Sequence, residues 1–79
     1  MWWFLKKIQD CKDYVVYAYG RETKDVSGRI RFDKSTQTGT VEQAAENDTI
    51  NMATRFLLPH IYRVVVKENC PSERQIAIG

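Results

Sequence analysis

The stretch YVVYAYG, residues 14–20, decides the fold, because it is apolar on both of the faces that a strand presents. Side chains alternate between the two faces of an extended chain. Here the two alternating sets are both apolar: Tyr14, Val16 and Ala18, and Val15, Tyr17 and Tyr19. Apolar residues on both faces are typical of a strand in the interior of a sheet. We therefore predict that residues 14–20 form such a strand.

Two more strands are predicted after it. Residues 26–33, VSGRIRFD, alternate cleanly between apolar and polar side chains, which indicates a half-buried strand. Thr40–Ala45 is a weaker third strand in which Val41 is the clearest core residue. Polar turns separate the three segments, so we expect them to pair as an antiparallel meander.

The strongest helical pattern lies in NDTINMATRFLLPHIYRVVVKEN, residues 47–69. Asp48 or Thr49 is suited to cap its start, and Asn69 precedes Cys70-Pro71 at its end. At about 100° per residue its apolar side chains fall on one arc. The predicted core face comprises Ile50, Ala53, Leu57, Leu58, Ile61, Val64 and Val65. Pro59 lies opposite this arc, so we expect it to face solvent and to bend the helix without breaking the core face.

The two ends complete the predicted fold. Leu5, Ile8 and Cys11 recur at helical spacing, which favours a short helix over residues 3–12, and RQIAIG, residues 74–79, alternates as a last short strand. A right-handed crossover would add that strand in parallel, beside the third strand or, better, beside residues 14–20. We predict a two-layer α+β fold: a four-stranded mixed sheet in the order 3-2-1-4, one long helix on one face, and the short N-terminal helix.

Size and charge limit the class of protein. The 79 residues, 1–79, suit a single small domain. Twelve Lys and Arg against ten Asp and Glu leave a net charge of +2, which is too small to mark the chain for nucleic acid or a membrane surface. The longest apolar run is far shorter than the about 20 residues needed to span a bilayer. We expect no membrane span.

The start of the chain and its cysteines point to the cytoplasm. In MWWFLKKIQD the apolar residues precede the lysines, the reverse of a signal peptide. Cys11 and Cys70 lie in no metal-binding spacing and are far apart in the chain, which favours two free thiols in a reducing compartment.

No motif of catalysis is found. The sequence has no nucleophile elbow, no zinc-protease helix motif and no glycine-rich phosphate loop. His60, the single histidine, has no second histidine or carboxylate at a helical metal spacing. We expect a non-catalytic protein without metal or cofactor.

One face of the predicted sheet has no helix to cover it, and it invites a binding hypothesis. The pattern places Tyr17 and Tyr19 there beside Arg29 and Arg31. Aromatic rings interleaved with guanidinium groups suit contact with a protein partner. They also suit single-stranded nucleic acid, or a face that the chain covers or hydrates by itself. We predict a protein-binding module on this face, with single-stranded nucleic acid as the alternative.

The run Trp2-Trp3-Phe4 needs cover, because each large apolar side chain costs roughly 1.5–3 kcal/mol when left in water. The three residues can fold back over the domain, form a contact between two copies, or insert at a membrane interface with Lys6 and Lys7 at the headgroups. If Trp2 and Trp3 are exposed, we expect them to form a second contact site.

Overall fold

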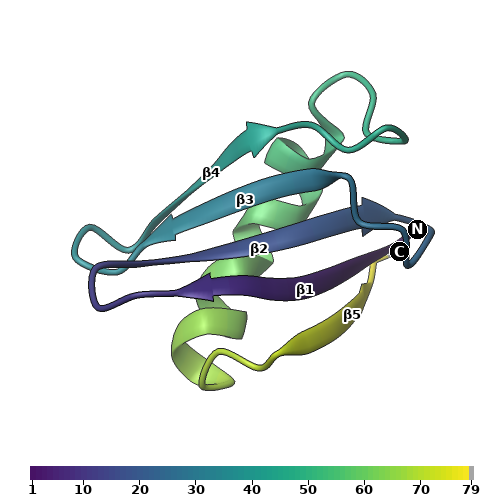
Figure 1. Cartoon of the computed structure of the whole chain (residues 1–79). Coiled ribbons are helices and arrows are strands. Elements are labelled where there is room, and N and C mark those ends of the chain that lie inside the picture. The colour runs from purple at the N-terminus through teal and green to yellow at the C-terminus, as the bar shows by residue number, and fades with distance from the viewer. Residues whose placement is uncertain (79) are drawn as a thin grey trace.

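The computed structural model describes residues 1–78, which form one antiparallel sheet with a helix packed on one of its faces (Figure 1). The strands are β1 (Trp2–Asp10), β2 (Tyr14–Arg21), β3 (Gly28–Asp33), β4 (Thr38–Gln43) and β5 (Glu73–Ala77). The helix runs through three consecutive segments, η1 (Ala53–Leu57), α1 (Leu58–Tyr62) and η2 (Arg63–Lys67), 15 residues in all.

Strand β2 is the buried strand that its sequence predicts. Every residue from Val15 to Gly20 is buried, and β2 lies between β1 and β3. Its pairing with β3 joins Tyr14 to Asp33 at one end and Tyr19 to Gly28 at the other. Strand β4 then pairs antiparallel with β3, so the predicted meander of three strands is confirmed.

The predicted four-stranded mixed sheet and the N-terminal helix are wrong. The sheet has five strands in the order β4-β3-β2-β1-β5, all antiparallel. Residues 2–10 form β1 because bulky aromatic residues favour strands, and alternation buries Trp3 and Leu5 completely. Strand β5 pairs antiparallel with β1, placing Ile76 opposite Trp3, and does not pair with β2 in parallel. The chain therefore uses its N-terminal segment to extend the sheet.

The helix is shorter than its pattern predicts. Ile50 and Asn51 have φ of 57° and 55°, in the left-handed region, so regular helix begins only after them. Ile50, predicted to be in the core, is 83% exposed. Asp48 still serves the helix start, because its Oδ1 accepts the Ala53 N–H at 3.0 Å. The rest of the arc is buried as predicted, except that Leu58 is only partly buried.

Pro59 faces solvent, as predicted, and wide helical turns lie on both sides of it. The Leu58 N–H bonds to the Ala53 carbonyl five residues earlier, and the Glu68 N–H bonds in the same way to Arg63. A proline lacks an N–H and crowds the preceding turn. Pro59 itself lies in α1, between these π-type turns, and the inner face of the helix stays buried through all three segments.

The core lies between the helix and the sheet face turned toward it. Its largest fully buried side chains are Trp3, Tyr17, Tyr19, Phe32, Leu5, Ile30, Leu57, Ile61, Val15 and Val64. Among residues 1–78, no helix is long and apolar enough to cross a membrane.

Candidate functional site

Within residues 1–78, no second layer covers the sheet face turned away from the helix. In Figure 1 the helix lies behind the sheet, so the viewer looks onto this face. We call it the open face, and strand alternation with the pairing registers defines its members. They are Trp2, Phe4, Lys6, Gln9, Tyr14, Val16, Ala18, Arg29, Arg31, Asp33, Thr38, Thr40, Gln43, Glu73, Gln75 and Ala77.

The middle of the open face consists of small apolar side chains on β2, with long cationic side chains on the strands at either side. Ala18 pairs with Lys6 of β1 and with Arg29 of β3, and Val16 pairs with Arg31. Ala18 is only 1% exposed and Val16 only 7%, although no helix lies above them. Because no helix lies on this side, side chains of the neighbouring strands cover these two residues.

The cations of the open face lack anionic partners. Lys6, Arg29 and Arg31 on the strands, and Lys24 in the adjoining β2–β3 turn, take no part in any ion pair within 4.0 Å in residues 1–78. The ion pairs lie elsewhere, around the carboxylates of Asp10 and Glu68. The open face thus carries cations that form no salt bridge within residues 1–78, and it shares them with two carboxylates, Asp33 and Glu73.

Two acidic residues share the open face with these cations but form no salt bridge with them. Glu73 lies opposite Lys6 at the β5 edge of the sheet, without a salt bridge between them. Asp33, opposite Tyr14, is held by its own turn: its Oδ1 accepts bonds from the Ser35 hydroxyl, at 2.7 Å, and the Ser35 and Thr36 N–H groups. The Ser35 hydroxyl and these N–H groups, with a smaller contribution from the Arg31 charge, lower the pKa of Asp33 and favour its ionised form.

Two aromatic rings of the open face are already in contact with cations. The Arg31 guanidinium lies 4.0 Å from the centre of the Tyr14 ring, and the Lys24 ammonium lies 5.8 Å from the centre of the Phe4 ring. The Tyr14 hydroxyl also accepts a bond from Gln9 Nε2 at 2.9 Å. These ring faces are therefore partly occupied by cations.

Tyr17 and Tyr19 do not belong to the open face, and their predicted side of the sheet is wrong. Both rings are 0% exposed and lie under the helix, away from Arg29 and Arg31. Their cross-strand partners are Ile30 and Gly28, on the core side of β3. Because both alternating sets of β2 are apolar, the sequence pattern did not show which set would face the helix.

The two buried tyrosines are structural anchors. The Tyr17 hydroxyl donates to the Pro71 carbonyl at 2.5 Å. The Tyr19 hydroxyl donates to Asp48 Oδ2 at 2.5 Å and accepts the Ala45 N–H at 3.1 Å. Burial, the main cause, raises the pKa of both phenols above the ordinary value, so both stay neutral.

The two tryptophans, Trp2 and Trp3, lie on opposite faces of the sheet. Trp3 is 0% exposed in the core, with its ring centre 6.0 Å from that of Tyr19. Trp2 is partly buried on the open face, opposite Ala77. Phe4 and Lys6 reach the open face by the same alternation, and they were missed because residues 3–12 were predicted to be helical.

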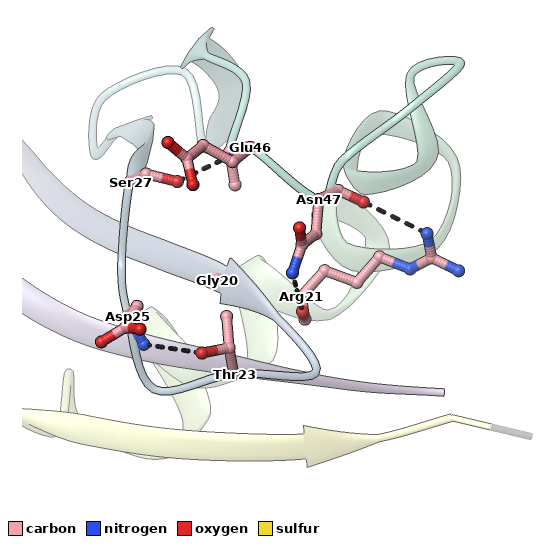
Figure 2. Close-up of a pocket in the computed structure, with 8 residues that line it drawn as sticks. Gly20, Arg21, Thr23, Asp25, Ser27, Glu46 and Asn47 are labelled. Carbon is pink, nitrogen blue, oxygen red and sulfur yellow. Dashed lines mark hydrogen bonds between the residues drawn. The ribbon is translucent and has the colours of Figure 1, made fainter.

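A pocket of about 160 Å³ lies between the β2–β3 turn and the loop that leads to the helix (Figure 2). Arg21 and Asn47 bind each other twice across it, from guanidinium to carbonyl at 3.2 Å and from amide to carbonyl at 3.3 Å. Figure 2 shows the Arg21 guanidinium reaching toward Asn47 and away from the carboxylates of Asp25 and Glu46. These groups do not converge on one point, so the contacts serve to join the two loops.

The structure offers no metal centre in its described part. Within residues 1–78, no three side chains of histidine, cysteine, aspartate or glutamate gather in a way that could hold a metal ion. Cys11 and Cys70 are free thiols.

Comparison with models of known families, with curated proteins and with solved structures finds no match to this chain. The chemistry of the open face is therefore the basis on which a function can be assigned.

Proposed function

We propose that this chain is a non-catalytic binding module whose open face holds an acidic segment of a partner protein. The supporting observation is the cluster of Lys6, Lys24, Arg29 and Arg31, which has no ion-pair partners in residues 1–78 and lies on the one sheet face without a covering layer. Complementary charge guides association and fixes the register of a partner.

The two arginines suggest the form of that segment. Arg29 and Arg31 lie two residues apart on β3, so their side chains leave the same face about 6.6 Å apart. Alternate side chains of an extended peptide have the same spacing. Each guanidinium fork can bind one carboxylate with two hydrogen bonds. An extended segment with acidic residues at alternate positions therefore fits along β3.

A protein partner is favoured over single-stranded nucleic acid by the state of the aromatic rings. Bases bind to such surfaces by stacking on aromatic faces. The rings of Tyr14 and Phe4 are already in contact with Arg31 and Lys24. The net charge of +2 adds little general attraction for a polyphosphate.

The proposal can be tested by NMR titration of the ¹⁵N-labelled chain with a peptide of alternating glutamate and threonine. We expect chemical-shift changes over the open-face residues of β1, β2 and β3, and binding that weakens as salt is added. A peptide with glutamine in place of glutamate is the matched control and should cause no such changes.

Variants locate the site. Arg29→Ala and Arg31→Ala should each weaken peptide binding, whereas Arg55→Ala, at an exposed position of the helix, should not. Equal effects of the three variants, or shifts confined to other surfaces, would contradict the proposal. Tighter binding of a thymidine oligonucleotide than of the peptide would replace it with the nucleic-acid alternative. A dimer in sedimentation that buries the open face would show that a second copy is the partner.

A further inference from the structure

A second concave site lies on the helix side of the sheet, away from the open face. It is a groove of about 520 Å³ between the end of the helix and the ends of β1 and β3. Its lining residues are Asp10, Phe32, Lys34, Val65, Val66, Asn69 and Cys70. This volume falls within the range of about 300–1,000 Å³ that small-molecule sites occupy.

One side of the groove is apolar. It is formed by Phe32 from β3 with Val65 and Val66 from the helix. Val66 is 41% exposed, whereas the edges of Phe32 and Val65 reach the groove from the core. Because Phe32 and Val65 are already buried, hydrocarbon on this side would remove mainly the surface of Val66 from water, a favourable change of about 25 cal/mol per Å².

The other side carries one positive charge in excess when Lys7, which does not line the groove but bonds to its lining residues Asp10 and Cys70, is counted with Lys34 and Asp10. Lys34 Nζ donates to Asp10 Oδ1 at 2.8 Å and to the Cys11 carbonyl at 2.7 Å. Lys7 Nζ donates to Asp10 Oδ2 at 3.2 Å and to the Cys70 carbonyl at 3.1 Å. Both oxygens of the single carboxylate are thus engaged by two ammonium groups. Each ammonium has three N–H donors, so Lys34 retains one that these bonds do not use.

We propose that this groove binds a small amphipathic carboxylate, with its hydrocarbon against Phe32 and Val66 and its carboxylate at Lys34. The apolar side and the excess positive charge are complementary to the two ends of such a molecule. Asp10 does not repel it, because Lys7 and Lys34 neutralise that group.

The chain carries its own reporter for this site. Cys70 lines the groove, whereas Cys11 is not among its lining residues and has its thiol beside Gln9. Alkylation of the two cysteines by iodoacetamide can be followed separately by mass spectrometry of their peptides. Octanoate is the probe, and octylammonium, of equal length and opposite charge, is its control.

Octanoate should slow alkylation of Cys70 and leave Cys11 unchanged. When nine-tenths of the groove is filled, the reagent reaches only the remaining tenth, so the rate at Cys70 should fall about tenfold. Octylammonium should give no protection at the same concentration. Equal protection by both probes, protection of both cysteines, or no protection by millimolar octanoate would overturn the proposal.

Two variants make the test specific. Lys34→Met keeps the length of the side chain and removes its charge, and it should abolish protection by octanoate. Lys12→Met, at an exposed position of the β1–β2 turn, is the matched control and should retain protection. Lys34→Met also removes the bond to Asp10, so a second variant tests the groove without that change. Val66→Glu adds a carboxylate that repels octanoate at an exposed position of the groove. Protection that persists in folded Val66→Glu would also overturn the proposal.

Discussion

Tyr19 shows how one side chain joins three parts of this fold. Its hydroxyl bonds to Asp48 and to the Ala45 N–H, both in the loop that leads to the helix. The other oxygen of Asp48 accepts the Ala53 N–H at the helix start. Strand β2, the loop and the helix are therefore connected through a single phenol and a single carboxylate.

Tyr19→Phe should lower the free energy of unfolding by about 1–3 kcal/mol, because it leaves the buried Ala45 N–H without its acceptor. Urea unfolding of the variant measures the loss. Tyr62→Phe is the matched control, since Tyr62 is 38% exposed, and it should change stability little. Equal losses in the two variants would contradict the role given to the Tyr19 hydroxyl.

Gly28 is required by the same ring. A Cβ at position 28 would collide with the Tyr19 ring, whose position is fixed by its hydroxyl bonds. Gly28→Ala should therefore cost about 1–3 kcal/mol through overpacking. At Gly39 an added Cβ would meet the ends of Leu58 and Ile61 at 3.2 and 3.3 Å, which can adjust, so Gly39→Ala should cost less. Thermal unfolding compares the two variants, and a larger loss at Gly39 would refute this account.

The sequence predicts the type of an element correctly where its apolar residues follow only one period, that of a strand or that of a helix. The prediction fails where the same residues fit both periods. Residues 26–33 alternate in only one way, and β3 forms there. Residues 3–12 place Leu5 and Ile8 at helical spacing, but Trp3 and Leu5 also alternate as in a strand. Pairing with β5, far away in the chain, decides between them, and a local pattern does not contain that information.

The ambiguity of a local pattern also explains which residues of the candidate site were predicted on the correct face of the sheet. Arg29 and Arg31 were placed correctly on the uncovered side of the sheet, because their strand has one polar and one apolar face. Tyr17 and Tyr19 were misplaced because β2 is apolar on both faces. The rule for right-handed crossovers did not predict the position of β5. That rule applies to parallel strands, whereas β5 is antiparallel to β1.

Pro59→Ala tests the irregular turns of the helix. Pro59 is exposed and lies between two stretches of wide turns. Proline inside a helix costs up to about 3 kcal/mol relative to alanine, so the variant should be more stable by up to that amount. Urea unfolding measures the gain, and circular dichroism should show no loss of helix. A less stable Pro59→Ala would mean that the wide turns are needed for packing.

For the molecule as a whole, ion pairs near the C-terminal end of the helix connect distant segments. Asp10 joins β1 to Lys34 in the β3–β4 turn. Glu68 at the end of the helix bonds to Arg74 in β5 at 2.7 Å. Lys34 and Lys7 lower the pKa of Asp10, and Arg74 lowers that of Glu68.

These shifts predict loss of stability in acid. A carboxyl group whose pKa is lowered by folding stabilises the folded state at any pH above its ordinary pKa, which is 3.8 for Asp10 and 4.5 for Glu68. This stabilisation is lost as the pH falls through the lowered pKa. The free energy of unfolding should fall as pH drops below about 4.5. The Asp10→Asn variant should show a smaller fall over that range, as followed by urea unfolding at each pH. An identical fall would show that Asp10 does not contribute.

Strand β1 lies between β2 and β5, so it depends on a strand that is synthesised more than 60 residues after it. A growing chain can form the meander of β1 to β4 while β1 still has a row of unpaired backbone groups beside Trp3 and Leu5. Unpaired edges of this kind attract other chains. We therefore expect a chain that lacks residues 73–77 to aggregate more readily than the full chain, because the β1 edge would stay unpaired.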